Sequence, residues 1–457
     1  MFGLIEDWNI MMYFVFIGVL LFVSKLIKEK IPFLNKVIIP TALIAGFIGL
    51  LLSDGFIGFV TLDREGIVKE IVYHSLAIGF IALSLKRDKN QTNKKVWSTG
   101  MIIVLTYLLQ AMVGIFVILV FFKDIFLGAG FLLPLGFGQG PGLANSQGTA
   151  FAEGVGQLSQ GGALGSTIAS VGFLVGGIIG VFALNYLARK HNLNVDKKHS
   201  ENSSIKESFE VETIKELRVF DSLTAQMTII FVIYFLVYLT LALLENVILP
   251  PIGDIGIVFA GVFHGFNFLI GIIYALIFKK ILVSLEKKGK NINFMTNNYV
   301  LSNISSIAFN FLITAAVLTI TIESIKEYYL LVIVMAIFGT IFTYVFLDFV
   351  IKKVYDKEFH PHYFLGMFGM LTGTASTGLA LLKGVDPDYK TPVAEEMVVG
   401  SGTAISMALP LFALLAFPGL AITNDNNIYN VIAIAVLIGY FALLLFVLLF
   451  MNRKSNK

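Results

Sequence analysis

Long apolar runs, separated by short polar and mostly basic segments, follow one another along the whole chain. A helix needs about 20 apolar residues to cross a hydrocarbon core roughly 30 Å thick. Eleven runs reach or approach this length. They predict transmembrane helices over residues 10–27, 37–60, 70–85, 98–122, 162–188, 222–244, 255–278, 300–322, 327–351, 395–418 and 428–452, of which the third is short. The hydropathy pattern therefore predicts an all-α polytopic membrane protein.

Two further apolar stretches, about 125–153 and 360–384, are each interrupted by glycine-rich polar sequence. The interruption reads "GFGQGPGLANSQGTAFAEG" in the first stretch and "LTGTASTG" in the second. The 13-residue arm "IFLGAGFLLPLGF" extends only about 20 Å as a helix, which is too short to span the membrane. We therefore predict two broken re-entrant hairpins, each returning to the side from which it started.

The distribution of positive charge supports this topology. With eleven crossings and two returning hairpins, 29 of the 33 Lys and Arg residues fall on one side, and only Arg64, Lys69, Lys123 and Lys326 fall on the other. Cytoplasmic loops carry the excess of Lys and Arg, so we expect the N-terminus outside and the C-terminus in the cytoplasm. Two thin crossings per broken stretch would give the same count, because the rule reports only parity.

The same assignment predicts an internal repeat. Residues 1–188 and 222–418 each contain five spans with a hairpin before the fifth. Because five is odd, the second unit starts from the opposite face, so the repeat is inverted. The polar segment 189–221 is predicted to be a cytoplasmic linker, and 428–452 an extra C-terminal transmembrane helix. Inverted repeats with broken helices are typical of secondary transporters; a passive channel and a membrane-embedded enzyme are the alternatives.

Composition narrows the chemistry further. The chain is 57% apolar and 14% charged, and it contains no cysteine, which excludes disulfides, Cys-ligated metals and thiol catalysis. The net charge of +3 comes from scattered clusters, which argues against nucleic-acid binding. The spans carry no clear Asp or Glu near their middle, so coupling to sodium is favoured over coupling to protons.

The broken stretches are the candidate substrate site. Irregular backbone at membrane depth is tolerated only where protein or a water-filled cavity satisfies it. The helix that restarts after each break points its first N–H groups toward the break, an arrangement that suits a carboxylate. Alternatively, the small residues serve only close helix packing. The candidate substrate-binding residues are Gln139, Gly140, Gly142, Asn145, Ser146, Thr149, Thr372, Gly373, Thr374, Ser376 and Thr377.

Sodium would be held by unpaired carbonyl groups at the ends of the incoming arms and by polar side chains of nearby spans. Asn303 and Asn310 lie on one stripe of a predicted helix, which either lines the substrate path or bonds to a neighbouring helix. Ser and Thr side chains in spans also satisfy carbonyl groups of their own helix. The candidate ion-binding residues are Gly136, Gly138, Gly369, Asn303, Asn310, Ser401 and Thr403.

Other polar and small residues are expected to be structural. Gly172, Gly176 and Gly180 are spaced four apart and predict a seam for tight packing against another helix. Three acidic residues lie at the ends of predicted segments, where we expect solvated carboxylates: Glu153, Glu395 and Glu396.

Four segments of the chain resemble the sodium/glutamate symporter family of bacterial inner membranes. They are "GFGQGPGLANSQGTAF", "GMFGMLTGTASTGLALL", "ASVGFLVGGIIGVFALNYLARKH" and, more weakly, "AIGFIALSL". The resemblance implies two inverted five-helix units with opposed re-entrant loops, glutamate uptake with sodium as the coupling ion, no further cofactor, and a homodimer in the lipid of the inner membrane. The residues alone indicate a sodium-coupled carrier, not an enzyme, for a small anionic or zwitterionic solute.

The chain departs from that family at both hairpin tips. The family carries a histidine among the glycines of each tip, whereas this chain has Gln139 in the first and Met367 or nearby apolar residues in the second. A carrier or exporter of a different small organic anion or amino acid is therefore the alternative to glutamate symport.

Overall fold

The chain is described by a computed structural model covering residues 8–31, 39–86, 94–153, 157–191, 222–253, 256, 260, 263–264, 267–288, 297–386 and 391–452. Within these ranges every regular element is helical, and a single bridge pairs Ser53 with Val60. Ten helical segments among the described residues are long and apolar enough to cross a membrane. This confirms the predicted all-α, multi-pass membrane class. The predicted linker 189–221 lies almost entirely outside the described residues.

The predicted span 37–60 is wrong in its length. Its helix, α3, covers only Thr41–Leu52, 12 residues, or about 18 Å at the helical rise. The Ser53 hydroxyl, just beyond the helix, donates to the Leu50 carbonyl oxygen, 2.7 Å away. The apolar residues beyond Leu52 belong to a turn, where the Ser53–Val60 bridge lies. The chain therefore has ten long apolar helices among the described residues, and not the eleven predicted.

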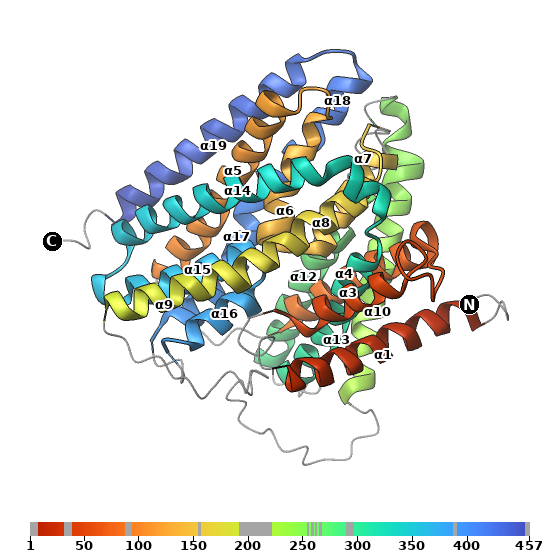
Figure 1. Cartoon of the computed structure of the whole chain (residues 1–457), viewed down its shortest axis with the longest axis horizontal. Helices are drawn as coiled ribbons and strands as arrows, with labels where there is room; N and C mark the ends of the chain where they lie inside the picture. Colours follow the sequence, from red (N-terminus) through yellow and green to blue (C-terminus); the bar gives the residue numbers. More distant parts are fainter. Residues whose placement is uncertain are drawn as a thin grey trace.

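Six helices form one side of the molecule, and we call them the α4–α13 group. Helices α4 and α13 pack along each other, α3 packs on α13, and α12 packs on α4, while α1 and α10 flank this arrangement. In Figure 1 the group occupies the right and lower right. Its members are α1 (Asn9–Lys30), α3 (Thr41–Leu52), α4 (Lys69–Leu85), α10 (Ser222–Leu243), α12 (Asn267–Lys287) and α13 (Asn298–Leu318).

The remaining helices form the α5 group, built around the most buried of the long helices. Helices α14, α17 and α19 pack on α5, and α6 to α9, α15 and α16 fill the space beside them. The members are α5 (Lys94–Phe121), α6 (Leu132–Gln139), α7 (Pro141–Glu153), α8 (Gly161–Leu174), α9 (Gly180–Lys190), α14 (Ile322–Val354), α15 (His360–Thr372), α16 (Ala375–Lys383), α17 (Val393–Leu414), α18 (Phe417–Thr423) and α19 (Ile428–Asn452).

The two groups meet along α7 and α8. Helix α7 contacts both α4 and α13, and α8 contacts α13. Glycines let the backbones approach closely on the other side of α7: a Cβ added to Gly148 would lie 2.0 Å from the Gly161 carbonyl oxygen of α8. Such close packing matters in lipid, where apolar helices gain little from leaving the solvent.

Two helices of the α5 group are each broken into a pair of short ones. Gly140 separates α6 from α7 with a φ of 91°, a backbone conformation that favours glycine. Pro141 then occupies the first position of α7, where its missing N–H costs no helical hydrogen bond. Gly373 and Thr374 separate α15 from α16 in extended or irregular conformations. The members of each pair pack against one another.

Candidate functional site

The two helix breaks lie beside each other. A Cβ added to Gly140, at the end of α6, would lie 3.6 Å from the Thr374 Cγ2 atom at the start of α16. The breaks are more than two hundred residues apart in the chain, but the fold brings them into contact. The sequence-predicted residues Gly140, Gly373 and Thr374 are therefore neighbours in space.

Helix α5 binds the last turn of both incoming helices. The Tyr107 hydroxyl donates to the Gly138 carbonyl oxygen of α6 at 3.1 Å. Less than one turn further along α5, the Gln110 amide donates to the Leu371 carbonyl oxygen of α15 at 2.8 Å and to the Thr343 hydroxyl at 3.0 Å. Both carbonyl groups belong to the last turn of a helix, where a carbonyl oxygen has no hydrogen-bond partner within its own helix. Tyr107 and Gln110 were not among the predicted site residues.

Asn145 is the centre of a buried polar cluster on α7. Its side-chain amide nitrogen lies 2.9 Å from the Gly162 carbonyl oxygen, 3.0 Å from the Ser166 hydroxyl and 2.9 Å from the Thr319 hydroxyl. The Ser166 and Thr319 hydroxyls are 3.1 Å apart. The cluster joins α7 to α8 and to the end of α13, so it lies where the two helix groups meet.

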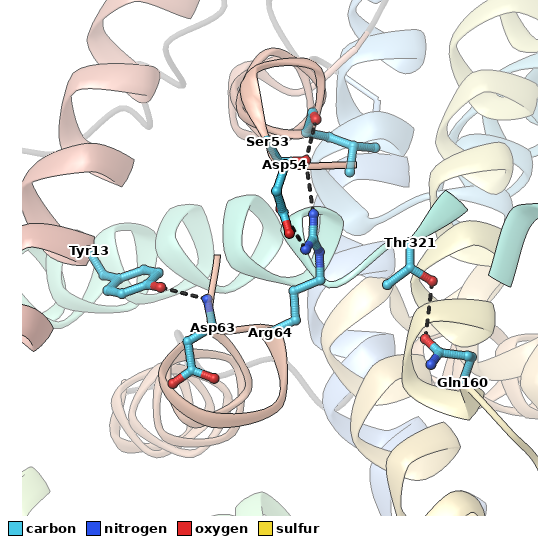
Figure 2. Close-up of polar contacts among 8 residues, drawn as sticks. Tyr13, Ser53, Asp54, Asp63, Arg64, Gln160 and Thr321 are labelled. Atoms are coloured by element: carbon cyan, nitrogen blue, oxygen red, sulfur yellow. Dashed lines mark hydrogen bonds and ion pairs between the residues drawn. The ribbon is translucent and has the colours of Figure 1, made fainter. Parts of the chain in front are cut away.

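A cavity of about 170 Å³ adjoins this cluster, and we call it the Arg64 cavity. Asn145 and Thr149 of α7 contribute to its wall, as does the start of α8. In Figure 2 two of the lining residues are drawn with their contacts: Arg64 extends to Asp54 and Ser53, and Gln160 bonds to Thr321. The cavity is lined by Arg64, Lys69, Asn145, Thr149, Ala152, Glu153, Gln160, Gly161, Gly162, Ala163 and Thr319.

The second break packs on the predicted glycine seam. A Cβ on Gly172 would lie 2.7 Å from the Thr372 carbonyl oxygen, and one on Gly176 would lie 2.9 Å from the Thr372 hydroxyl. Thr377 is buried against the same surface. The prediction of a small-residue seam is confirmed. A π-helical turn, Val175–Ile179, interrupts the helix here, and such turns are frequent at functional sites.

The remaining predicted substrate residues lie around the breaks. Gln139 is half-buried, and its amide nitrogen has no hydrogen-bond partner among the described residues. Gly142 packs on Leu312 of α13, and Ser146 is buried. The backbone of Ser376 lies in the first turn of α16, whereas its side chain is outside the described residues.

The predicted ion-binding residues do not all come together. Gly136 packs on α8, Gly138 on Tyr107 and Gly369 on Gly378 of α16. Asn303 and Asn310 are exposed on α13, and neither lines the Arg64 cavity.

Two predicted hydroxyl ligands, both on α17, bond within their own helix. Ser401 donates to the Met397 carbonyl oxygen and Thr403 to the Gly400 carbonyl oxygen.

Glu396 corrects one expectation, since its carboxylate is buried and not solvated. The Tyr363 hydroxyl of α15 donates to it at 2.6 Å. Tyr363 in turn stacks on Tyr355, with ring centroids 3.5 Å apart, and Tyr355 bonds to Thr99 of α5. This network fixes the start of α15 to α17 and α5. The sequence around Glu396 did not indicate that its carboxylate is buried, because the residues that contact it lie on other helices.

A second cavity, of about 540 Å³, lies between α4 and α10. Its wall is mostly aromatic, with Tyr73, His74, Tyr234 and His264 among its residues. None of the predicted site residues lines it. The polar groups at the helix breaks and the Arg64 cavity are therefore the better candidate site.

The sequence matches no protein-family model, and it has no significant match to a curated protein.

Proposed function

We propose that the protein is a secondary active transporter that carries glutamate or a similar small carboxylate-bearing amino acid together with sodium by alternating access. The proposed location is a bacterial inner membrane, with the N-terminus outside and the C-terminus in the cytoplasm, an orientation that requires the short helix α3 to count as a crossing in addition to the ten long helices. In this proposal α6–α7 and α15–α16 are re-entrant hairpins, and residues 1–188 and 222–418 are inverted repeats. The observation that carries the proposal is the contact between the two helix breaks at Gly140 and Thr374.

The packing of the helices is the kind that an inverted repeat requires. In chain order, α1, α3 and α4 precede α5, the α6–α7 pair and α8; α10, α12 and α13 precede α14, the α15–α16 pair and α17. Equivalent helices make equivalent contacts, since α3 packs on α13 and α12 packs on α4. Transporters with inverted repeats bind their substrate where discontinuous helices meet, near the midplane of the membrane.

The anchoring of the two broken pairs supports opposed hairpins. Glu153, the last residue of α7, forms an ion pair with Lys69 at the start of α4. Tyr363, near the start of α15, bonds to Glu396 at the start of α17. Lys69, at the start of α4, lines the same cavity as Thr319, at the end of α13, whereas the start of α17 is joined through Tyr363 to Tyr355, just beyond the end of α14. In this proposal the two pairs therefore start from opposite ends of α14. Each break then lies between the ends.

The Asn145 cluster contains oxygen atoms of the types that hold a sodium ion, although the Asn145 amide nitrogen, a donor, now lies among them. One amide group is surrounded by three oxygen acceptors, although an amide nitrogen carries only two hydrogens. Hard cations are held by carbonyl and hydroxyl oxygens such as these. Sodium coupling therefore needs no titratable group at the helix breaks.

Uptake into proteoliposomes tests the proposal. The purified full chain is reconstituted, and accumulation of radiolabelled glutamate is measured with an inward sodium gradient and with potassium in its place. We expect saturable accumulation that requires the sodium gradient and ceases when a sodium ionophore collapses it. Absence of sodium stimulation for every amino acid and dicarboxylate in a panel would contradict the proposal.

Transport of a different small anion is the second candidate. The nitrogen of the Gln139 side-chain amide has no hydrogen-bond partner among the described residues. Because an amide offers two N–H donors and one oxygen acceptor, Gln139 can bind a different group of the solute from the one that a histidine binds. Competition of unlabelled aspartate, glutamine and succinate against labelled glutamate separates the two candidates. Glutamate should compete best if it is the substrate.

A further inference from the structure

The Arg64 cavity contains two basic side chains that the helix breaks themselves lack. Arg64 and Lys69 both line it, and they come from the segment that leads from α3 into α4. The wall also carries four uncharged polar side chains that can each donate a hydrogen bond, namely Asn145, Thr149, Gln160 and Thr319. Helix α8 begins at Gly161 on the same wall, so its positive dipole end adds to the field in the cavity.

Arg64 is held in place on one edge of its guanidinium group. One terminal nitrogen donates to the Asp54 carboxylate at 2.8 Å and the other donates to the Ser53 hydroxyl at 2.9 Å. The Nε atom is buried and has no hydrogen-bond partner among the described residues. The side chain is only 13% exposed, so its charge acts in a region that water screens weakly. Figure 2 shows this fixed orientation.

Lys69 is paired within the protein. Its ammonium group contacts the carboxylate of Glu153, which is the last residue of α7 and also lines the cavity. The Glu153 side chain is 59% exposed and Lys69 is 27% exposed, so the pair lies at the mouth of the cavity. An exposed ion pair of this kind contributes little to stability and exchanges readily with a competing anion.

We propose that Arg64 and Lys69 form an anion subsite for the side-chain carboxylate of the solute at the entrance to the transport path, where the solute binds before it reaches the helix break about 20 Å away along α7. The Glu153 carboxylate occupies the place of that ligand group in the present conformation. An incoming carboxylate displaces Glu153 from Lys69 and accepts further hydrogen bonds from the uncharged donors of the wall. The inference rests on the proposed transport function for the identity of the ligand as an acidic solute.

Calorimetric titration of the purified full chain tests the subsite directly. The probes are L-glutamate, succinate and, as the neutral analogue, L-glutamine, in sodium buffer at low ionic strength, where charge interactions are least screened. We expect wild-type protein to bind both acidic probes. Lys69→Gln should weaken glutamate and succinate binding by about tenfold, the loss of one charge-assisted hydrogen bond, and leave glutamine binding unchanged.

The placeholder role of Glu153 predicts the opposite effect for its own substitution. Glu153→Gln should tighten binding of the acidic probes by about threefold or more, because the internal competitor loses its charge. Lys69→Arg should retain binding, which separates loss of the charge from a folding defect. Lys123→Gln is the matched control: Lys123 is an exposed lysine beyond the end of α5 that does not line the cavity, and its substitution should leave all three affinities unchanged.

Failure of the subsite and failure of the transport proposal are distinguishable. Sodium-driven glutamate uptake with unchanged selectivity for acidic over neutral solutes in Lys69→Gln would overturn the subsite and leave the transporter standing. Acidic probes that bind with the predicted variant effects, without any sodium-driven uptake, would support the subsite and overturn the transporter. Wild-type protein that binds neither acidic probe would overturn the subsite.

Discussion

At the scale of single residues, Asn145 connects three helices through one amide group. It bonds to Gly162 and Ser166 of α8 and to Thr319 just beyond α13. All of these groups are buried, so removing the amide takes a hydrogen-bond partner from three buried oxygen atoms. Such losses typically cost about 1–3 kcal/mol.

Asn145→Ala is therefore expected to abolish sodium-driven uptake and to lower the free energy of unfolding by about 1–3 kcal/mol, while the protein still inserts into the membrane. Uptake into proteoliposomes and thermal unfolding in detergent measure the two effects. Asn185→Ala is the control, since Asn185 is exposed on α9 and its side chain bonds, among the described residues, only to the carbonyl oxygen one turn earlier in its own helix. Normal uptake by the Asn145 variant would remove this cluster from the mechanism.

At the scale of elements, the helix formed by α8 and α9 supports the second break. Its glycine seam contacts Thr372 through Gly172 and Gly176, and Gly180 contacts Leu381 of α16. The neighbour of Gly172 is a backbone carbonyl oxygen, which cannot rotate away as a side chain can. The position of the second break is therefore fixed by backbone contact with this helix.

Gly172→Ala should displace the Thr372 backbone, because the new Cβ would lie 2.7 Å from its carbonyl oxygen. We expect a loss of about 1–3 kcal/mol in unfolding free energy, as for overpacked cores, and a strong decrease in the maximal rate of uptake. Gly402→Ala is the matched control within α17, since a Cβ at Gly402 meets no atom within 4 Å. Equal uptake by both variants would show that the seam does not support the transport site.

The elements differ in how well the sequence predicts them. The long apolar runs predicted the ten long helices, because little besides a transmembrane helix has that composition. The span 37–60 was predicted too long, since apolar residues such as Phe56 and Phe59 continue beyond the end of α3 at Leu52. Hydropathy averages over a window and does not detect where a helix ends within an apolar run. The predicted span 255–278 lies partly outside the described residues, and its described part from Asn267 onward belongs to α12.

At the scale of the whole molecule, the site depends on contacts that sequence spacing cannot reveal. Asn145 and Thr319 are 174 residues apart, and Gln110 and Leu371 are 261 residues apart. The glycine-rich breaks could be predicted because their composition is unusual for a membrane helix. Their partners on α5, α8 and α13 could not be, because ordinary Tyr, Gln, Ser and Thr residues in apolar helices carry no local signal. Arg64 was predicted only as a positive charge outside the membrane.

The arrangement of the two helix groups gives the account its central claim. The α5 group holds both breaks, and it meets the α4–α13 group along α7 and α8. If the groups move against each other, the space beside Gly140 and Thr374 is exposed first to one side of the membrane and then to the other, as alternating access requires. Thr374 is half-buried, so it is a suitable place for a probe, whereas the positive φ of Gly140 makes any side chain unfavourable there.

Side-specific labelling of Thr374→Cys tests this claim most directly. The chain contains no cysteine, so the introduced thiol is the only target for a membrane-impermeant maleimide in vesicles of either orientation. Thr228→Cys, on the exposed face of α10, is the lipid-facing control and should remain unlabelled. We expect Thr374→Cys to react from both sides and to be protected by sodium together with glutamate. A thiol that reacts from neither side, or from one side only under all conditions, would contradict the account.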